Sequence, residues 1–208
     1  MRLEIDNLNI RHHQNQDLRF VFNSRLLDKK VPPRILIVID NPGRSDLKNK
    51  EYLSGRAGKN ARNILVNYNI IDKYPEDVAV LCKTPLYTET PDKLRSVEIK
   101  YDKLYELSQE FMADILIDLM KVLPLCETWV LEPPPNNKSY FKYYYSQLEF
   151  LTKTNPDIGS RIRYLKSFAN SNFELDFLRT FYRLHKDATV VSEIIDKMQL
   201  RTNSEASQ

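Results

Sequence analysis

Four short apolar runs divide the chain, and each is bounded by polar or turn-forming positions. Their lengths suit strands better than helices, and the first two are continuous and rich in β-branched residues. Continuous apolar strands are typical of a parallel sheet that is covered on both faces. The sequence therefore predicts four buried strands, at residues 35–39, 78–81, 128–131 and 162–165.

Between these strands, apolar residues recur at spacings of three and four, which indicates amphipathic helices. The clearest helix covers residues 101–123, where Leu104, Leu107 and Phe111 follow this spacing and Pro124 ends the pattern. The same reasoning predicts further helices at residues 16–27, 58–68, 140–151, 173–184 and 190–200.

Strands that alternate with helices predict an α/β protein. We expect a three-layer α/β/α sandwich with a central four-stranded parallel sheet, formed by one domain over residues 1–200 and followed by a disordered tail at 201–208. Ligands of such sheets bind beyond the carboxyl ends of the strands. The loops that follow Ile39, Leu81, Leu131 and Leu165 should therefore converge on one site.

The composition is that of an ordinary globular domain, since 42% of the 208 residues are hydrophobic and 28% are charged. No apolar run is long enough to span a membrane, and the first residues are too polar for a secretory signal. Cys82 and Cys126 lie in apolar stretches, as expected of buried thiols in a reducing compartment. We therefore expect an intracellular monomer, cytoplasmic or nuclear, that does not contact membranes.

Several kinds of chemistry are disfavoured by the residues present. The three histidines lack the spacing to cysteine or acidic residues that zinc sites use, and two cysteines are too few for an iron–sulfur cluster. The chain also lacks a P-loop and a Gly-x-Ser-x-Gly nucleophile elbow. We expect no metal and no cofactor.

Residues 35–59 concentrate the features that suggest a ligand site. Three of the chain's four glycines fall in this segment, at Gly43, Gly55 and Gly58. Glycine permits close backbone approach, and the amides that open the helix predicted after Gly58 can hold an anion. Residues 44–62 carry six basic and two acidic side chains, with Arg56 and Lys59 placed to contact a phosphate. The alternative is an ordinary strand–turn–helix connection with a solvated basic face.

Three stretches carry a resemblance to a known family. They are Ile-Asp-Asn-Pro-Gly at 39–43, Leu-Ser-Gly-Arg-Ala-Gly at 53–58 and Cys-Lys-Thr-Pro-Leu at 82–86. In this order the chain resembles the uracil-DNA glycosylase superfamily, nearest to its single-strand-selective and Asn-Pro-Gly branches. The resemblance covers roughly residues 34–180, and it implies a partner, DNA, and hydrolysis of the bond between deoxyribose and a deaminated or damaged base.

The resemblance also implies roles for particular residues. Asn41 takes the position that holds the attacking water, and Asp40 beside it is the second candidate catalytic residue. Candidate base contacts are Gly43, Tyr52, Leu53 and Cys82. Candidate DNA contacts are Arg44, Ser54, Gly55, Arg56, Gly58 and Lys59, with Ser167, Phe168 and Asn170 in a DNA-inserting loop.

The sequence departs from the family pattern at five places, and the first is the absence of the glycine that precedes the apolar position of the first motif. Asp40 stands where the family has an apolar residue, Leu53 replaces the stacking phenylalanine with Tyr52 beside it, and Cys82 replaces the asparagine that reads uracil. Residues 167–171 contain no histidine, although Phe168 offers an apolar wedge or, alternatively, a core residue. These departures leave two rivals to an active glycosylase, which are a catalytically inactive DNA-binding or scaffold protein and a nucleoside or nucleotide hydrolase.

Overall fold

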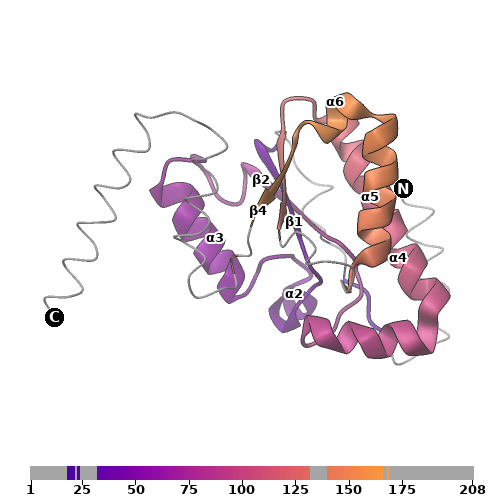
Figure 1. The fold of residues 1–208 in the computed structure, drawn as a ribbon. Coiled ribbons are helices and arrows are strands. Elements are labelled where there is room, and N and C mark those ends of the chain that lie inside the picture. The colour runs from indigo at the N-terminus through magenta and orange to yellow at the C-terminus, as the bar shows by residue number, and fades with distance from the viewer. Residues whose placement is uncertain (1–17, 22, 24–31, 132–139, 166–167, 169–208) are drawn as a thin grey trace, which may run out of the picture.

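The structure is a computed structural model of the chain, and it describes residues 18–21, 23, 32–131, 140–165 and 168 (Figure 1). Ten elements follow in the order β1, α2, α3, β2, η2, α4, β3, α5, α6 and β4 within these residues. Strands and helices alternate through most of this order, as the hydrophobic pattern predicts.

The four predicted strands are confirmed and form one parallel sheet. They are β1 (Ile35–Ile39), β2 (Val78–Cys82), β3 (Glu127–Leu131) and β4 (Ile162–Leu165). Their spatial order is β2-β1-β3-β4, so the first strand lies inside the sheet and pairs with β2 on one side and β3 on the other. All four carboxyl ends therefore lie along the same edge of the sheet.

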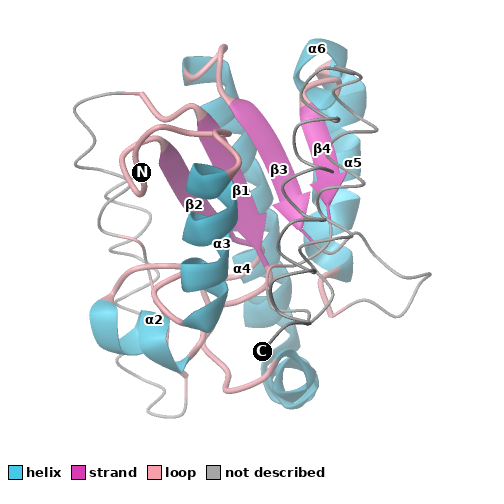
Figure 2. Cartoon of the chain, turned by 90° about the vertical axis from the view of Figure 1, so that its left-hand side faces the viewer, coloured by secondary structure: helices cyan, strands magenta, loops and turns pink. Residues whose placement is uncertain are grey.

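Helices cover both faces of the sheet, which confirms the three-layer arrangement (Figures 1 and 2). Helix α3 (Arg56–Asn67) packs on one face, and helices α4 (Leu94–Val122) and α5 (Lys142–Thr154) pack together on the other. Alternate strand residues divide between two hydrophobic clusters, with Ile35, Ile37, Val78, Val80 and Trp129 facing α3 and Leu36, Val38, Ala79, Leu81 and Val130 facing α4 and α5. Because the side chains of a strand alternate between faces, a continuous apolar run fills both clusters.

The helix boundaries differ from those predicted. Helix α3 begins at Arg56 rather than at residue 58, and α4 begins at Leu94, seven residues before the predicted start. Helix α4 consists of two helical segments joined at a kink, where Tyr101 has the non-helical angles φ −140° and ψ 44°. Three short elements were not predicted, namely α2 (Arg44–Asn49), η2 (Pro91–Lys93) and α6 (Pro156–Gly159).

The helix predicted for residues 16–27 is wrong over residues 18–21. This segment is extended, and Phe20 forms an antiparallel bridge with Leu86. The amide of Val21 donates to the carbonyl of Pro85 at 2.9 Å, and that of Tyr87 donates to the carbonyl of Arg19 at 2.8 Å. Pairing with the chain after β2 satisfies backbone groups that a helix would satisfy internally, and it buries Leu18 and Val21.

The helices predicted at 173–184 and 190–200, the tail at 201–208, and the site residues Ser167 and Asn170 lie outside the described residues. Within the described part of the chain, no helix has both the length and the apolar character needed to cross a membrane.

Candidate functional site

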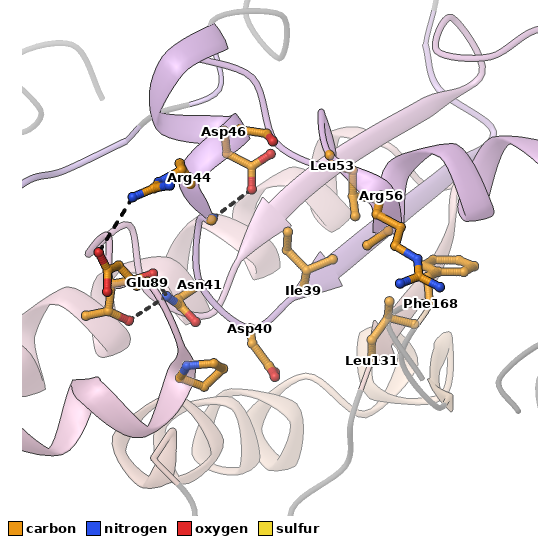
Figure 3. Close-up of a pocket in the computed structure, with 16 residues that line it drawn as sticks. Ile39, Asp40, Asn41, Arg44, Asp46, Leu53, Arg56, Glu89, Leu131 and Phe168 are labelled. Carbon is orange, nitrogen blue, oxygen red and sulfur yellow. Dashed lines mark hydrogen bonds and ion pairs between the residues drawn. The ribbon is translucent and has the colours of Figure 1, made fainter. Parts of the chain in front are cut away.

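A cleft of about 480 Å³ opens at the carboxyl edge of the sheet (Figure 3). Residues from the end of every strand, or from the chain beyond it, line this cleft: Ile39, Asp40 and Asn41 at β1, Thr88 and Glu89 after β2, Leu131 at β3 and Phe168 after β4. The predicted convergence is therefore confirmed for the strand ends and for the described residues beyond β1, β2 and β4, while the loop after Leu131 lies outside the described residues. The cleft also lies within the range of about 300–1,000 Å³ that is common for small-molecule sites.

The buried carboxylate of Asp46 joins the two loops that resemble the glycosylase family. Its Oδ2 accepts a hydrogen bond from the amide of Gly43 at 2.8 Å, and its Oδ1 accepts from the amide and the hydroxyl of Ser54, each at 2.9 Å. One side chain thereby holds the residues after β1 against those before α3. Sequence reasoning missed Asp46, although an acidic residue in the first turn of a helix is a recognised N-terminal feature.

Gly58 lies against the backbone of Leu53 and not in the cleft. A Cβ atom at residue 58 would lie 1.4 Å from the carbonyl oxygen of Leu53, so only glycine fits beneath this loop. Leu53 itself has φ 55°, a left-handed conformation that is uncommon for a branched side chain. The predicted contact of Gly58 with a phosphate is therefore replaced by a packing role that fixes the start of α3.

Asn41 has a fixed side-chain orientation. Its Nδ2 donates to Oγ1 of Thr88 at 2.9 Å, and it also lies 3.3 Å and 3.4 Å from the carbonyl oxygens of Pro42 and Thr88. Carbonyl oxygens accept only, so the nitrogen and not the oxygen of the amide must face them. The Oδ1 atom of Asn41, which lines the cleft, accepts no hydrogen bond from any described residue.

Asp40 forms an ion pair with a fully buried lysine. Nζ of Lys83, the residue directly after β2, lies 2.5 Å from Oδ1 of Asp40 and 2.6 Å from the carbonyl oxygen of Leu131. The same ammonium lies 4.9 Å from the ring centre of Phe141 and 5.2 Å from that of Tyr145. Lys83 thus joins the carboxyl ends of β1, β2 and β3. Sequence reasoning assigned it no role, although a lysine directly after a buried strand is unusual.

Charged side chains surround the mouth of the cleft. The exposed residues Arg44 and Arg56 both line it, and Nη2 of Arg44 lies 3.9 Å from Oε1 of Glu89. Arg44 and Glu89 also border a second hollow of about 560 Å³, whose other lining residues are Arg19, Leu47, Lys48 and Tyr87. The basic side chains predicted to contact DNA therefore lie next to the cleft at Arg44 and Arg56.

Tyr52 and Cys82 do not reach the cleft, so the structure corrects their expected place in it. Both side chains are buried beneath the loops, and the Tyr52 hydroxyl donates to the carbonyl of Val21 at 2.5 Å. Burial raises the pKa of both groups well above the usual values, and the nearby Cys82 raises the pKa of Tyr52 further. Their side chains complete the core under α3, because an apolar ring and a thiol fit there.

The remaining candidate residues also divide into those that line the cleft and those that do not. Leu53, Gly43 and Gly55 line the cleft, whereas Ser54 bonds to Asp46 and Lys59 points to solvent away from the lining. Phe168 lines one wall but is only 1% exposed. Its carbonyl accepts a hydrogen bond from Asn60 at 3.2 Å. The expected wedge is therefore a core residue in this conformation.

The described residues contain no group of three or more histidine, cysteine, aspartate or glutamate side chains that could hold a metal ion. Comparison with family models, with curated proteins and with solved structures gives no match for this chain. The fold and the cleft define the class, which is a three-layer α/β protein with a cleft at the carboxyl edge of a four-stranded parallel sheet.

Proposed function

We propose that the protein is DNA glycosylase-like, and that it hydrolyses the N-glycosidic bond of a deaminated or damaged base in DNA. The observation that carries the proposal is Asn41, whose amide nitrogen is held by Thr88 while its Oδ1 lies at the cleft without a partner among the described residues. The same residue takes the water-holding position in the resemblance. The three-layer fold with a parallel four-stranded sheet is also the one that the resemblance implies.

The chemistry required of the site is modest. A water held on Oδ1 of Asn41 would add to the anomeric carbon as the bond to the base breaks, and the base would leave with the electron pair of that bond. The water's proton would pass to solvent or to the departing base. An amide is a weak base, but a sugar that already carries positive character needs an oriented water more than a strong base. Arg44 and Arg56 at the mouth of the cleft would contact the phosphates on either side of the nucleotide.

A second candidate is a catalytically inactive DNA-binding protein with the same fold. It is favoured by Cys82, which stands where the resemblance places the uracil reader but is fully buried and outside the cleft lining. A thiol is in any case a poor donor and acceptor. The active and inactive alternatives share the cleft and the basic residues at its mouth, so they differ in cleavage and not in binding.

A cleavage assay separates these alternatives. Labelled oligonucleotides that carry uracil, hypoxanthine or xanthine, single- and double-stranded, are incubated with the protein and then treated with alkali to break abasic sites. Cleavage by the wild type that falls at least about a hundredfold in Asn41→Ala supports a water-positioning amide, because positioned groups contribute on this order. DNA binding without cleavage supports the inactive alternative. Absence of both cleavage and binding contradicts any function on DNA.

Asn63→Ala is the matched control for this assay. Asn63 is an exposed asparagine of α3 outside the lining of the cleft, so its loss removes an amide without altering the proposed water site. Equal loss of cleavage in both variants would contradict the role assigned to Asn41.

A further inference from the structure

The hydrogen-bonding character of the cleft floor restricts which base it can accept. We define this floor as Ile39, Asp40, Asn41 and Leu131, the lining residues at the carboxyl ends of β1 and β3. The Nδ2 of Asn41 is already engaged by Thr88, and the other side chains of the floor are apolar or acidic. Among the described side chains, the floor therefore presents acceptor oxygens and no available donor.

Asp40 is the floor residue with acceptor capacity to spare. A carboxylate has about four acceptor sites over its two oxygens, and Lys83 occupies one of them, on Oδ1. Its Oδ2 accepts no hydrogen bond from a described residue, and the side chain keeps 29% of its surface exposed. The carboxylate is thus tethered on its buried side and open on its cleft side.

Lys83 holds this carboxylate in one place. The ammonium is fully buried, and it donates to oxygens at the ends of β1 and β3. A buried ammonium without a negative partner is strongly unfavourable, so the ion pair opposes rotation of the Asp40 side chain away from the floor. Lys83 is a positioning residue that sets what Asp40 can bind.

We propose, on the basis of the proposed function, that Asp40 selects a base that carries the amino–imino edge of guanine, whether or not the base is damaged elsewhere. On that edge a ring N–H and an exocyclic amino group lie side by side, and a carboxylate accepts from both at once. Hypoxanthine lacks the amino group and offers one such bond. Uracil offers one N–H between two carbonyl oxygens, which a carboxylate repels.

The charges at the mouth of the cleft agree with such a ligand. Arg44 and Arg56 place positive charge where the sugar–phosphate backbone of a bound nucleotide would lie, while the floor carries the negative group that meets the base. The cleft therefore matches a nucleotide unit with an anionic backbone and a donor-rich base edge.

The test measures binding and does not require catalysis. Fluorescence anisotropy gives the affinity of the wild type for oligothymidines that carry one central guanine, hypoxanthine or uracil. We expect guanine to bind about tenfold more tightly than hypoxanthine, the effect of one further hydrogen bond to a charged acceptor, and uracil to bind most weakly. In Asp40→Asn, which keeps an oxygen for Lys83, the guanine preference should fall to within about twofold.

Glu89→Gln is the matched control, because it removes one negative charge from the lining of the same cleft at an exposed position. It should change the affinity for all three oligonucleotides alike and leave their ratios intact. Equal binding of guanine and hypoxanthine by the wild type, or a preference that survives in Asp40→Asn, would overturn the selection proposed here. Absence of binding to every oligonucleotide would instead overturn the proposed function. Selective binding without cleavage would support the selection by Asp40 and contradict catalytic activity.

Discussion

Nζ of Lys83 lies 2.5 Å from Oδ1 of Asp40, yet the two partners of this ion pair differ in their access to water. The lysine side chain is fully buried, whereas the aspartate side chain is 29% exposed at the cleft. The pair therefore joins the core of the sheet to the surface that a ligand would meet. Substitution of the aspartate and substitution of the lysine should therefore change the free energy of unfolding by different amounts.

We expect Asp40→Ala to destabilise the protein by about 3–5 kcal/mol, because it leaves a buried ammonium without its negative partner. Lys83→Met should cost less, about 1–2 kcal/mol, since the Asp40 carboxylate can rehydrate and a methionine fills most of the lysine's volume. Urea denaturation measures both free energies of unfolding. Lys93→Met, which breaks the exposed pair with Glu89, should change stability by less than about 1 kcal/mol. A larger loss in Lys83→Met than in Asp40→Ala would contradict this account.

Asp46→Ala should destabilise the protein by about 2 kcal/mol. The substitution leaves the amides of Gly43 and Ser54 without their carboxylate acceptor, and each such loss costs about 1–3 kcal/mol, toward the low end where water can reach the site. The proposed DNA affinity should fall as well, because the two loops lose their connection. Asp118→Ala, at an exposed aspartate of α4 paired with Lys121, should alter neither property by a measurable amount.

Gly58→Ala tests the close approach of α3 to Leu53. Alanine favours a helix over glycine by about 1 kcal/mol, so intrinsic propensity alone predicts stabilisation. The added Cβ would lie 1.4 Å from a backbone oxygen, however, and relieving such overlap typically costs about 1–3 kcal/mol or more. We therefore expect net destabilisation in thermal unfolding. Gly43→Ala is the control, since its Cβ would meet Asp46 at 3.7 Å and the backbone φ there is −93°, which alanine adopts readily. A rise in melting temperature for Gly58→Ala would contradict the contact.

Stability should fall as the pH rises above about 9, and more steeply above about 10. Burial raises the pKa of Tyr52, Tyr105 and Tyr144 above the value of an exposed tyrosine, so the unfolded chain releases these protons first. The unfolded state then binds fewer protons than the folded state, and the free energy of unfolding falls by about 1.4 kcal/mol per pH unit for each group. Cys82, whose pKa burial also raises, adds to the fall from about pH 9. Urea denaturation at several alkaline pH values gives this slope, which Tyr52→Phe should reduce. A free energy of unfolding that stays constant through this range would exclude the effect.

The hydrophobic pattern was sufficient to predict the strands of the sheet, because buried parallel strands must be apolar on both faces. It also located the cleft, since parallel strands place their carboxyl ends along one edge. It failed at residues 18–21, where pairing with Leu86 and its neighbours decides the conformation and no local pattern encodes that partner. The prediction also missed the first turns of α4, before the kink at Tyr101, although Leu94 and Val97 there follow the apolar spacing.

The candidate site was predictable in position but not in detail. Residues near the glycines were expected to contact a ligand, yet Gly58 is glycine because of Leu53, and Tyr52 faces the core. Whether a loop residue faces the cleft or the core depends on which side of the loop is turned to the sheet. The spacing of residues in the sequence does not specify this. Asp46 and Lys83 were missed because their partners, Gly43, Ser54, Asp40 and Leu131, come from loops and strands whose approach only the fold determines.

The bonds that Asp46 makes to Gly43 and Ser54 hold the two loops together through groups of the chain itself. The conformational entropy of ordering these two loops is consequently lost when the chain folds and not when a ligand binds. Such pre-organisation lets a larger share of the contact energy appear as affinity. It also couples the order of the two loops to the ligand affinity. A substitution that loosens these loops would weaken binding even where it touches no atom of the ligand.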